Sequence, residues 1–165
     1  MATPQYWQKA TQELAERDPV LRELTARRGG MTPELLCAAH HARLRACGLS
    51  GQKAGYVLDL AAHFANGTLD PAHWHDLDDQ ALIAQLTRVK GIGRWTAEMF
   101  LIFYLARPDV LPIADVGLQR AMRVQYNKGK PLTPTKMVRI GKTWAPWRSV
   151  ATWYLWRSLE ALPVE

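Results

Sequence analysis

Apolar side chains recur along this chain every three or four residues, which is the spacing of helices with one buried face. No stretch combines apolar–polar alternation with β-branched residues, so strands are not expected. The pattern predicts an all-α protein. Its helices are expected at Tyr6 to Leu14, Pro19 to Arg28, Pro33 to Cys47, Ser50 to Asn66-Gly67, after Asp78 or Asp79 through Leu86, Arg94 to Leu105, after Asp115 through Tyr126, from Pro134, and from Pro146.

Capping residues mark the ends of these segments. Side chains that accept a hydrogen bond from a helical N–H stand before most of them, namely Asp18, Thr32, Ser50, Asp78 or Asp79, Asp115 and Thr133. Gly48 and Asn66-Gly67 are typical of helix C-termini. Between the helices, residues 110–114 are predicted to be non-helical, and 127–134 is the one linker candidate.

The length of 165 residues suits one domain or two small lobes that share a core, and we expect a single domain over 1–165. Within it we distinguish a hairpin at 79–105, a loop and following helix at 108–126, and C-terminal helices at 134–160. No apolar run is long enough for a membrane span, and the N-terminus lacks the pattern of a signal peptide. We therefore expect a cytoplasmic protein without a membrane partner, and no protein partner is evident.

The net charge of +6 favours a polyanionic partner. Acidic residues gather at 59–79, whereas basic residues dominate 88–94 and 120–148. This layout fits a one-sided basic surface, although an ordinary solvated face would look the same. Metal and disulfide chemistry is not expected. Cys37 and Cys47 are expected on one helix as free thiols, and His73 and His75 have no third ligand fixed by spacing.

The turn Lys90-Gly91-Ile92-Gly93 joins two predicted helices. Two glycines permit a tight reversal, and Ile92 between them can anchor the turn in the core. The second helix would present its N-terminal N–H groups to a phosphate, with Lys90 and Arg94 beside it. Such a turn binds the nucleic-acid backbone and makes no base-specific contacts. A plain helical corner with closely packed glycines is the alternative.

The segment Leu86 to Phe100 resembles the hairpin of the helix-hairpin-helix (HhH-GPD) DNA glycosylase superfamily, and most closely its DNA-3-methyladenine glycosylase II branch. Trp144 to Trp156 and the opening Tyr6-Trp7 with Asp18 to Leu21 are similar to that family too. The resemblance implies an HhH glycosylase-like helical fold with double-stranded DNA as partner. We expect the protein to be cytoplasmic, or nucleoid-associated in a bacterium. The expected DNA-binding residues are Lys90, Gly91, Ile92, Gly93, Arg94 and Thr96. The hairpin backbone of relatives holds a monovalent cation, and no other cofactor is expected.

In this family, a short loop about twenty residues after the hairpin ends in the catalytic aspartate, which here is Asp115. N-glycosidic cleavage builds positive charge on the deoxyribose, and a nearby carboxylate stabilises that charge and can orient or deprotonate the attacking water. Asp before a helix is most often a plain N-cap, and the two roles are compatible. The resemblance also implies a pocket for the flipped base, formed by Trp95, Trp156 and Met99. Cationic alkylated purines would be attracted to its aromatic rings.

Relatives that also cut the DNA strand carry a lysine nucleophile two residues after the second glycine of the hairpin. Here that residue is Trp95. Without an amine no Schiff base is expected, so the resemblance implies a monofunctional hydrolase of alkylated purines such as 3-methyladenine, acting in base excision repair. Arg148, in the sequence Pro-Trp-Arg-Ser, is expected to be a hydrogen-bonding anchor rather than a catalyst.

The resemblance breaks between Arg28 and Met31. Family members carry two further helices there, with a Gly-Gln-Gln-type motif whose loop fills the gap left by the flipped base. An internally shortened fold leaves the unstacking of the base uncompensated. The alternative to an active glycosylase is therefore a DNA-binding protein that has lost base flipping. A small helical scaffold with incidental basic charge is a third possibility.

Overall fold

The computed structural model describes Glu16 and residues 33–160, and these residues form helices, turns and loops without a strand. The prediction of an all-α fold is confirmed. The first predicted helix, from Tyr6, and the second, from Pro19, lie outside the described residues. No helix in the described part of the chain is long and apolar enough to cross a membrane.

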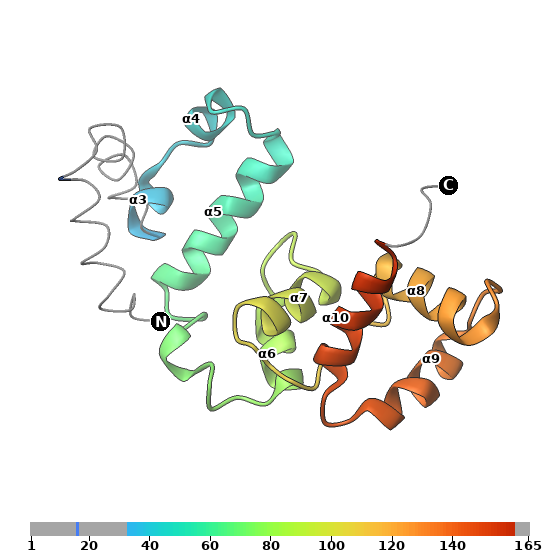
Figure 1. Cartoon of the computed structure of the whole chain (residues 1–165). Coiled ribbons are helices and arrows are strands. Elements are labelled where there is room, and N and C mark those ends of the chain that lie inside the picture. Colours follow the sequence, from blue (N-terminus) through green and yellow to red (C-terminus); the bar gives the residue numbers. More distant parts are fainter. Residues whose placement is uncertain (1–15, 17–32, 161–165) are drawn as a thin grey trace. The chain divides into compact units, whose positions relative to one another are not determined.

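The chain divides into two compact units. Unit 1 comprises residues 1–76 and 88–91, and unit 2 comprises 77–87 and 92–165. Each unit is described by itself, and the expectation of a single domain stays a prediction. Figure 1 labels the helices of both units.

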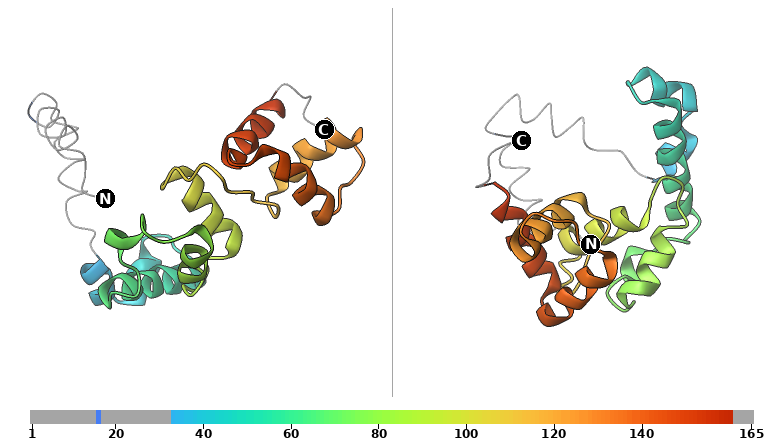
Figure 2. Two further views of the ribbon diagram at one scale, coloured as in Figure 1. Left: turned by 90° about the horizontal axis from the view of Figure 1, so that it is seen from below. Right: turned by 90° about the vertical axis from the view of Figure 1, so that its right-hand side faces the viewer.

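Unit 1 contains α3 (Pro33–Ala38), α4 (His41–Ala46), α5 (Gly51–Ala65) and the short 3-10 helix η1 (Pro71–His73). The helices α3 and α4 both pack against α5, beside which they lie in Figures 1 and 2. The single helix predicted from Pro33 to Cys47 is wrong. His40 adopts an extended backbone (ψ 139°) and starts α4 anew, and the His41 ring meets the Gly51 carbonyl at 2.9 Å. Cys37 and Cys47 consequently do not share a helix, and both are free thiols.

The helix α5, which is the longest among the described residues of this unit, begins and ends where the sequence predicts. The Ser50 side chain accepts the Lys53 N–H, and the helix ends at Asn66 before Gly67, whose φ is +76°. Small residues on its inner face allow neighbouring segments to approach closely. The buried residues of unit 1 include Ala54, Ala61, Leu69, Trp74 and Val89.

Unit 2 contains α6 (Asp79–Leu86), α7 (Arg94–Phe103), α8 (Val116–Asn127), α9 (Pro134–Gly141), the 3-10 helix η2 (Lys142–Trp144) and α10 (Arg148–Ser158). Three predicted N-caps are confirmed, because Asp78, Asp115 and Thr133 accept the N–H groups of Ala81, Leu118 and Lys136. The predicted start of the last helix at Pro146 is wrong by two residues. Trp147 lies outside helical geometry (ψ 33°), so α10 begins at Arg148.

Two layers of apolar packing hold unit 2. The helices α6 and α7 contact each other through fully or nearly fully buried side chains such as Leu82, Leu86, Ala97 and Leu101. The helix α10 runs along α8 and buries Leu155 in a cluster with Leu118, Ala121, Met122 and Met137. Because Asp115 caps α8, this packing fixes the carboxyl group relative to α10.

Candidate active site

The carboxyl group of Asp115 accepts three hydrogen bonds and is only 9% exposed. Its Oδ1 accepts the Leu118 backbone N–H at 2.6 Å and the Trp156 indole N–H at 2.7 Å. Its Oδ2 accepts the Trp95 indole N–H at 2.9 Å. Both oxygens therefore act as hydrogen-bond acceptors. The carboxylate therefore has a fixed orientation.

The two tryptophans reach Asp115 from different helices. Trp95 lies in the first turn of α7 and is half exposed, and Trp156 lies near the end of α10 and is half-buried. The structure thus brings together three of the predicted site residues, which are 20 and 41 positions apart in sequence. The fourth, Met99, is half-buried one helical turn after Trp95, so it shares a face of α7 with it. Their role in binding a base stays a prediction.

Phe103 extends this aromatic surface and is not among the predicted site residues. Its ring stacks on Trp156 with 5.7 Å between centroids and 14° between planes, although the side chain is 66% exposed. Parallel stacking restricts the indole plane of Trp156, and that plane sets the direction of the N–H group that Asp115 accepts. The sequence contains little indication of this role. Phe103 lies in a strongly apolar predicted helix, so a position in the core was the simpler interpretation.

Gly117 is a second residue that the sequence reasoning missed. A Cβ atom there would lie 3.1 Å from Asp115 Oδ1 and 3.1 Å from Trp156 Cδ1. Such contacts are tighter than ordinary van der Waals separation, so any side chain would push the indole and carboxylate apart. A glycine two residues after the candidate carboxylate was the available signal.

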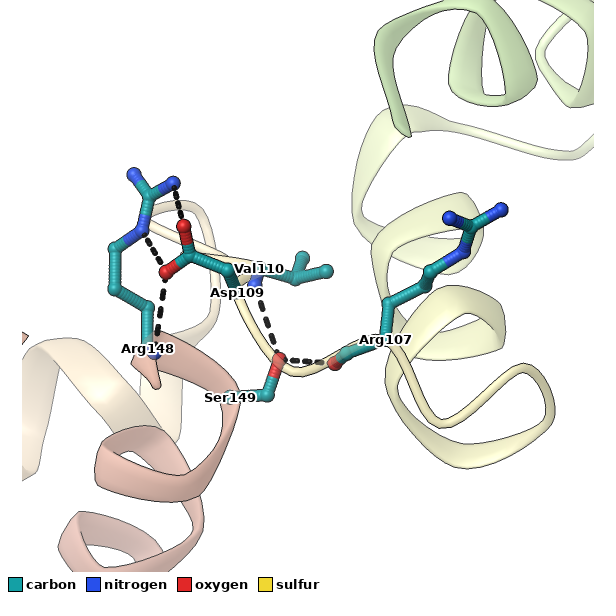
Figure 3. Close-up of polar contacts among 5 residues, drawn as sticks. All are labelled: Arg107, Asp109, Val110, Arg148 and Ser149. Carbon is teal, nitrogen blue, oxygen red and sulfur yellow. Dashed lines mark hydrogen bonds and ion pairs between the residues drawn. The ribbon is translucent and has the colours of Figure 1, made fainter. Parts of the chain in front are cut away.

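The first turn of α10 is held by a cluster of polar contacts shown in Figure 3. Arg148 donates from Nε to Asp109 Oδ1 at 2.6 Å and from its terminal nitrogen to Oδ2 at 2.8 Å. The Ser149 hydroxyl donates to the Arg107 carbonyl at 2.6 Å and accepts the Val110 N–H at 3.0 Å. Arg148 is therefore the anchor that the sequence predicted. The cluster ties α10, and with it Trp156, to the loop that leads to Asp115.

We expect Arg148→Gln to lower the free energy of unfolding by about 1–2 kcal/mol near pH 7, because it removes a bidentate, charge-assisted pair that is about one-third exposed. Hydrogen bonds from Arg148 hold the pKa of Asp109 below its ordinary 3.8. A lowered pKa stabilises the folded state above pH 3.8, and this contribution is lost as the pH falls through the lowered value. Denaturant unfolding at several pH values should therefore show the difference between the two proteins shrinking below that pH.

Arg157→Gln is the matched control for this experiment. Arg157 also pairs with a carboxylate, Glu160, but both side chains are more than half exposed. Its substitution should change the free energy of unfolding by less than about 0.5 kcal/mol. Equal effects of the two substitutions would contradict the anchoring role of Arg148.

The first half of the hairpin turn, Lys90 and Gly91, belongs to unit 1. Gly91 has a φ of +85°, so the predicted need for glycine is met here. Asp59 of α5 accepts the Lys90 N–H at 2.8 Å and lies 3.5 Å from its ammonium nitrogen. This hydrogen bond from the backbone lowers the pKa of Asp59. The ammonium group of Lys90 stays three-quarters exposed, yet it already has an acidic neighbour that the sequence did not predict.

The second half of the turn, Ile92 and Gly93, belongs to unit 2 and leads into α7. Ile92 is half-buried, and Gly93 caps α7 with a φ of −86° that any residue can adopt. Thr96 is exposed in the first turn of the helix. Contact of these residues with DNA stays a prediction.

Arg94 also has an acidic partner. Its Nε donates to Glu98 Oε1 at 2.9 Å, and its terminal nitrogen donates to Gln80 at 3.2 Å. Glu98 is 2% exposed, and burial raises its pKa. A buried carboxylate on the helix that carries Trp95 is a feature that sequence reasoning missed, because Glu98 read as an ordinary polar position of a helix.

No group of three or more His, Cys, Asp or Glu side chains within residues 33–160 could hold a metal ion. The monovalent cation expected at the hairpin stays a prediction. The arrangement described above offers one fixed carboxylate with two indole rings beside it and a third ring behind one of them. Such a site can stabilise positive charge next to a flat aromatic ligand.

Known proteins are similar to this chain in sequence and in fold. The profile described as "HhH-GPD superfamily base excision DNA repair protein" matches residues 5–146. DNA-3-methyladenine glycosylase 1 of Schizosaccharomyces pombe is 38% identical over 130 residues, which cover 77% of this chain and 56% of that protein. The chain spans about half the length of the curated relatives it matches.

Two solved structures are similar to the chain. The 3-methyladenine DNA glycosylase of S. pombe in complex with abasic DNA superposes with a TM-score of 0.72 at 33% identity, covering 81% of this chain and 66% of that one. The DNA-3-methyladenine glycosidase of Bacillus halodurans gives a TM-score of 0.74 at 33% identity, covering 96% of this chain and 77% of that one.

Proposed function

Because the chain belongs to the HhH-GPD superfamily of base excision DNA repair proteins, we propose that it hydrolyses the N-glycosidic bond of alkylated purines, such as 3-methyladenine, in double-stranded DNA. The observation that carries this proposal is the Asp115 carboxylate, which is buried and held by three N–H donors beside two indole rings. The relatives named as 3-methyladenine glycosylases support the substrate class.

The geometry supports a division of roles among the residues of the site. As the bond to the base breaks, positive charge develops on the deoxyribose, and the Asp115 carboxylate stabilises it and orients the attacking water. The indole N–H groups of Trp95 and Trp156 hold both carboxylate oxygens, so little reorganisation is needed when the charge forms. The ring faces offer stacking surfaces for a base turned out of the duplex, and they attract a cationic base most strongly.

The first test is base release from duplex DNA that contains a methylated adenine. We expect released base without a strand break, because Trp95 occupies the position where an amine nucleophile would be needed. Borohydride treatment during turnover should trap no covalent protein–DNA adduct, and strand breaks should require added alkali. A trapped adduct would overturn the monofunctional mechanism.

A second candidate function is DNA binding without turnover. It is favoured by the absence of a Gly-Gln-Gln-type motif between Arg28 and Met31, since a flipped base then leaves a gap in the duplex that nothing fills. Tight, salt-sensitive binding of undamaged duplex without base release would support this candidate. The control is a variant in which the two helices are restored. Equal base release by this variant and by the original chain would exclude DNA binding without turnover as the function.

A further inference from the structure

We propose that a cavity between α8 and the segment before α9 binds the phosphate group of a phosphate ester. The cavity has a volume of about 280 Å³ and lies wholly within unit 2. The helix α8 contributes its first residue, Gln119 and two arginines, and the segment before α9 together with Met137 of α9 contributes an apolar wall. The lining includes Val116, Arg120, Arg123, Pro131, Leu132 and Met137.

The two arginines supply positive charge that no side chain among the described residues neutralises. Neither the Arg120 side chain nor the Arg123 side chain forms an ion pair or hydrogen bond with any residue that the structure describes. The Nε atom of Arg123 is fully buried and lacks an acceptor within that part of the chain. A buried donor without a partner is unfavourable, so an acceptor supplied by a ligand would relieve it.

The sequence around the cavity contains no competing acid. Between Asp115 and Glu160 the chain has nine Lys or Arg residues and no Asp or Glu. Several other arginines of unit 2 pair with carboxylates, as Arg94 does with Glu98 and Arg148 with Asp109. The α8 arginines differ in that their counter-charge must come from outside this segment.

Phosphate is the anion that these residues fit best. The planar guanidinium presents parallel N–H donors that match the oxygens of phosphate, and two of them on successive turns of α8 can share one group. The volume is at the lower end for small-molecule sites, so it accommodates a phosphate with part of an attached sugar. The remaining wall, formed by Pro131, Leu132 and Met137, suits the apolar edge of that sugar.

The position of the cavity suggests the source of the phosphate. Val116 lines it, and Val116 directly follows Asp115 in the chain. A strand whose sugar lies at the carboxylate would carry its neighbouring phosphates past α8. This assignment to a DNA strand rests on the proposed function, whereas the phosphate site itself does not, since a free phosphate ester offers the same oxygens.

The first arm of the test measures affinity for undamaged duplex DNA over a range of salt concentrations. Arg120→Gln should weaken binding by about five- to tenfold and lower the magnitude of the salt slope by about one. Arg123→Gln should act in the same way, and circular dichroism must show that both variants keep the helical fold. Arg139→Gln, which removes an exposed charge of α9 outside the cavity, is the matched control and should have a clearly smaller effect.

The second arm uses inorganic phosphate as probe, with chemical shifts of the arginine side chains as readout. One outcome is that inorganic phosphate shifts the Arg120 and Arg123 signals of the wild-type protein and leaves the Arg123 signal of Arg120→Gln unchanged. If the DNA affinity of Arg120→Gln also equals that of the wild type, the cavity is assigned to a free phosphate ester. Selective loss of DNA affinity would assign it to the strand. Responses equal to those of Arg139→Gln in both arms would overturn the proposal. Base release is measured in a separate experiment. If the protein releases no base but Arg120→Gln still weakens DNA binding, the proposed enzymatic activity is refuted and the proposed phosphate site is retained.

Discussion

Asp115→Asn should reduce base release from methylated duplex by about 10²–10³-fold while leaving DNA binding almost unchanged. The substitution removes the negative charge that opposes the developing charge on the sugar. It also places an amide NH₂ group against N–H donors, because Asp115 accepts from Trp95 and Trp156 on different oxygens. The helix should nevertheless survive, since Asn is as good an N-cap for α8 as Asp.

Single-turnover base release, with DNA affinity determined in parallel, is the measurement for Asp115→Asn. Asp78→Asn is its matched control, because Asp78 caps α6 as Asp115 caps α8, by accepting a backbone N–H at 2.8 Å. Asp78→Asn should keep the wild-type rate. Release by the Asp115→Asn protein at that same rate would remove Asp115 from the mechanism.

Alanine should have a different effect at each of the two glycines of the hairpin turn. Gly91→Ala should lower the free energy of unfolding by about 2–4 kcal/mol. Gly91 has a φ of +85°, where a Cβ atom is strained, and that atom would come within 2.6 Å of Tyr56 Cε2 and closer still to Cδ2. Denaturant unfolding should show this loss directly, and a stability equal to wild type would contradict the described turn.

Gly93→Ala is both the control for Gly91→Ala and a test of DNA binding. Gly93 has an ordinary φ of −86°, and an added Cβ would meet no atom within 4 Å, so the stability should fall by less than about 1 kcal/mol. The methyl group would nevertheless stand at the start of α7, where the free N–H groups are expected to meet a phosphate. We expect DNA affinity to fall about tenfold, equivalent to one charge-assisted hydrogen bond. Unchanged affinity would remove the helix start from the DNA contact.

Local signals accounted for much of what could be predicted. Ser50, Asp78, Asp115 and Thr133 cap helices because a short acceptor side chain before an apolar run satisfies the first free N–H groups, and this needs no tertiary contact. The split between α3 and α4 has no such signal. His40 leaves the helix without a proline or glycine, and the contact of His41 with Gly51 forms only after α5 has packed.

The bonding of the site could be predicted only in part. Trp95, Asp115 and Trp156 were identified from their positions in a family pattern, but spacing could not reveal that both indoles donate to the same carboxyl group. The acidic partner of Lys90 was hidden for the same reason, since Asp59 lies 31 residues before Lys90. Glu98 follows Arg94 by four residues, so that pair had a helical spacing that the sequence displays. Charge counted along the sequence therefore overstated the free positive charge at the hairpin.

The contacts that complete the site have a consequence for the order of its assembly during synthesis. Asp109 and Arg148 are 39 residues apart, and Asp115 and Trp156 are 41 apart. A nascent chain that has emerged only through α9 can hold the carboxylate on its helix, yet it still lacks the second indole and the anchor of α10. The ribosome must release α10 before the site can close, so the Asp115 carboxylate gains its full set of hydrogen bonds only after Trp156 has left the ribosome.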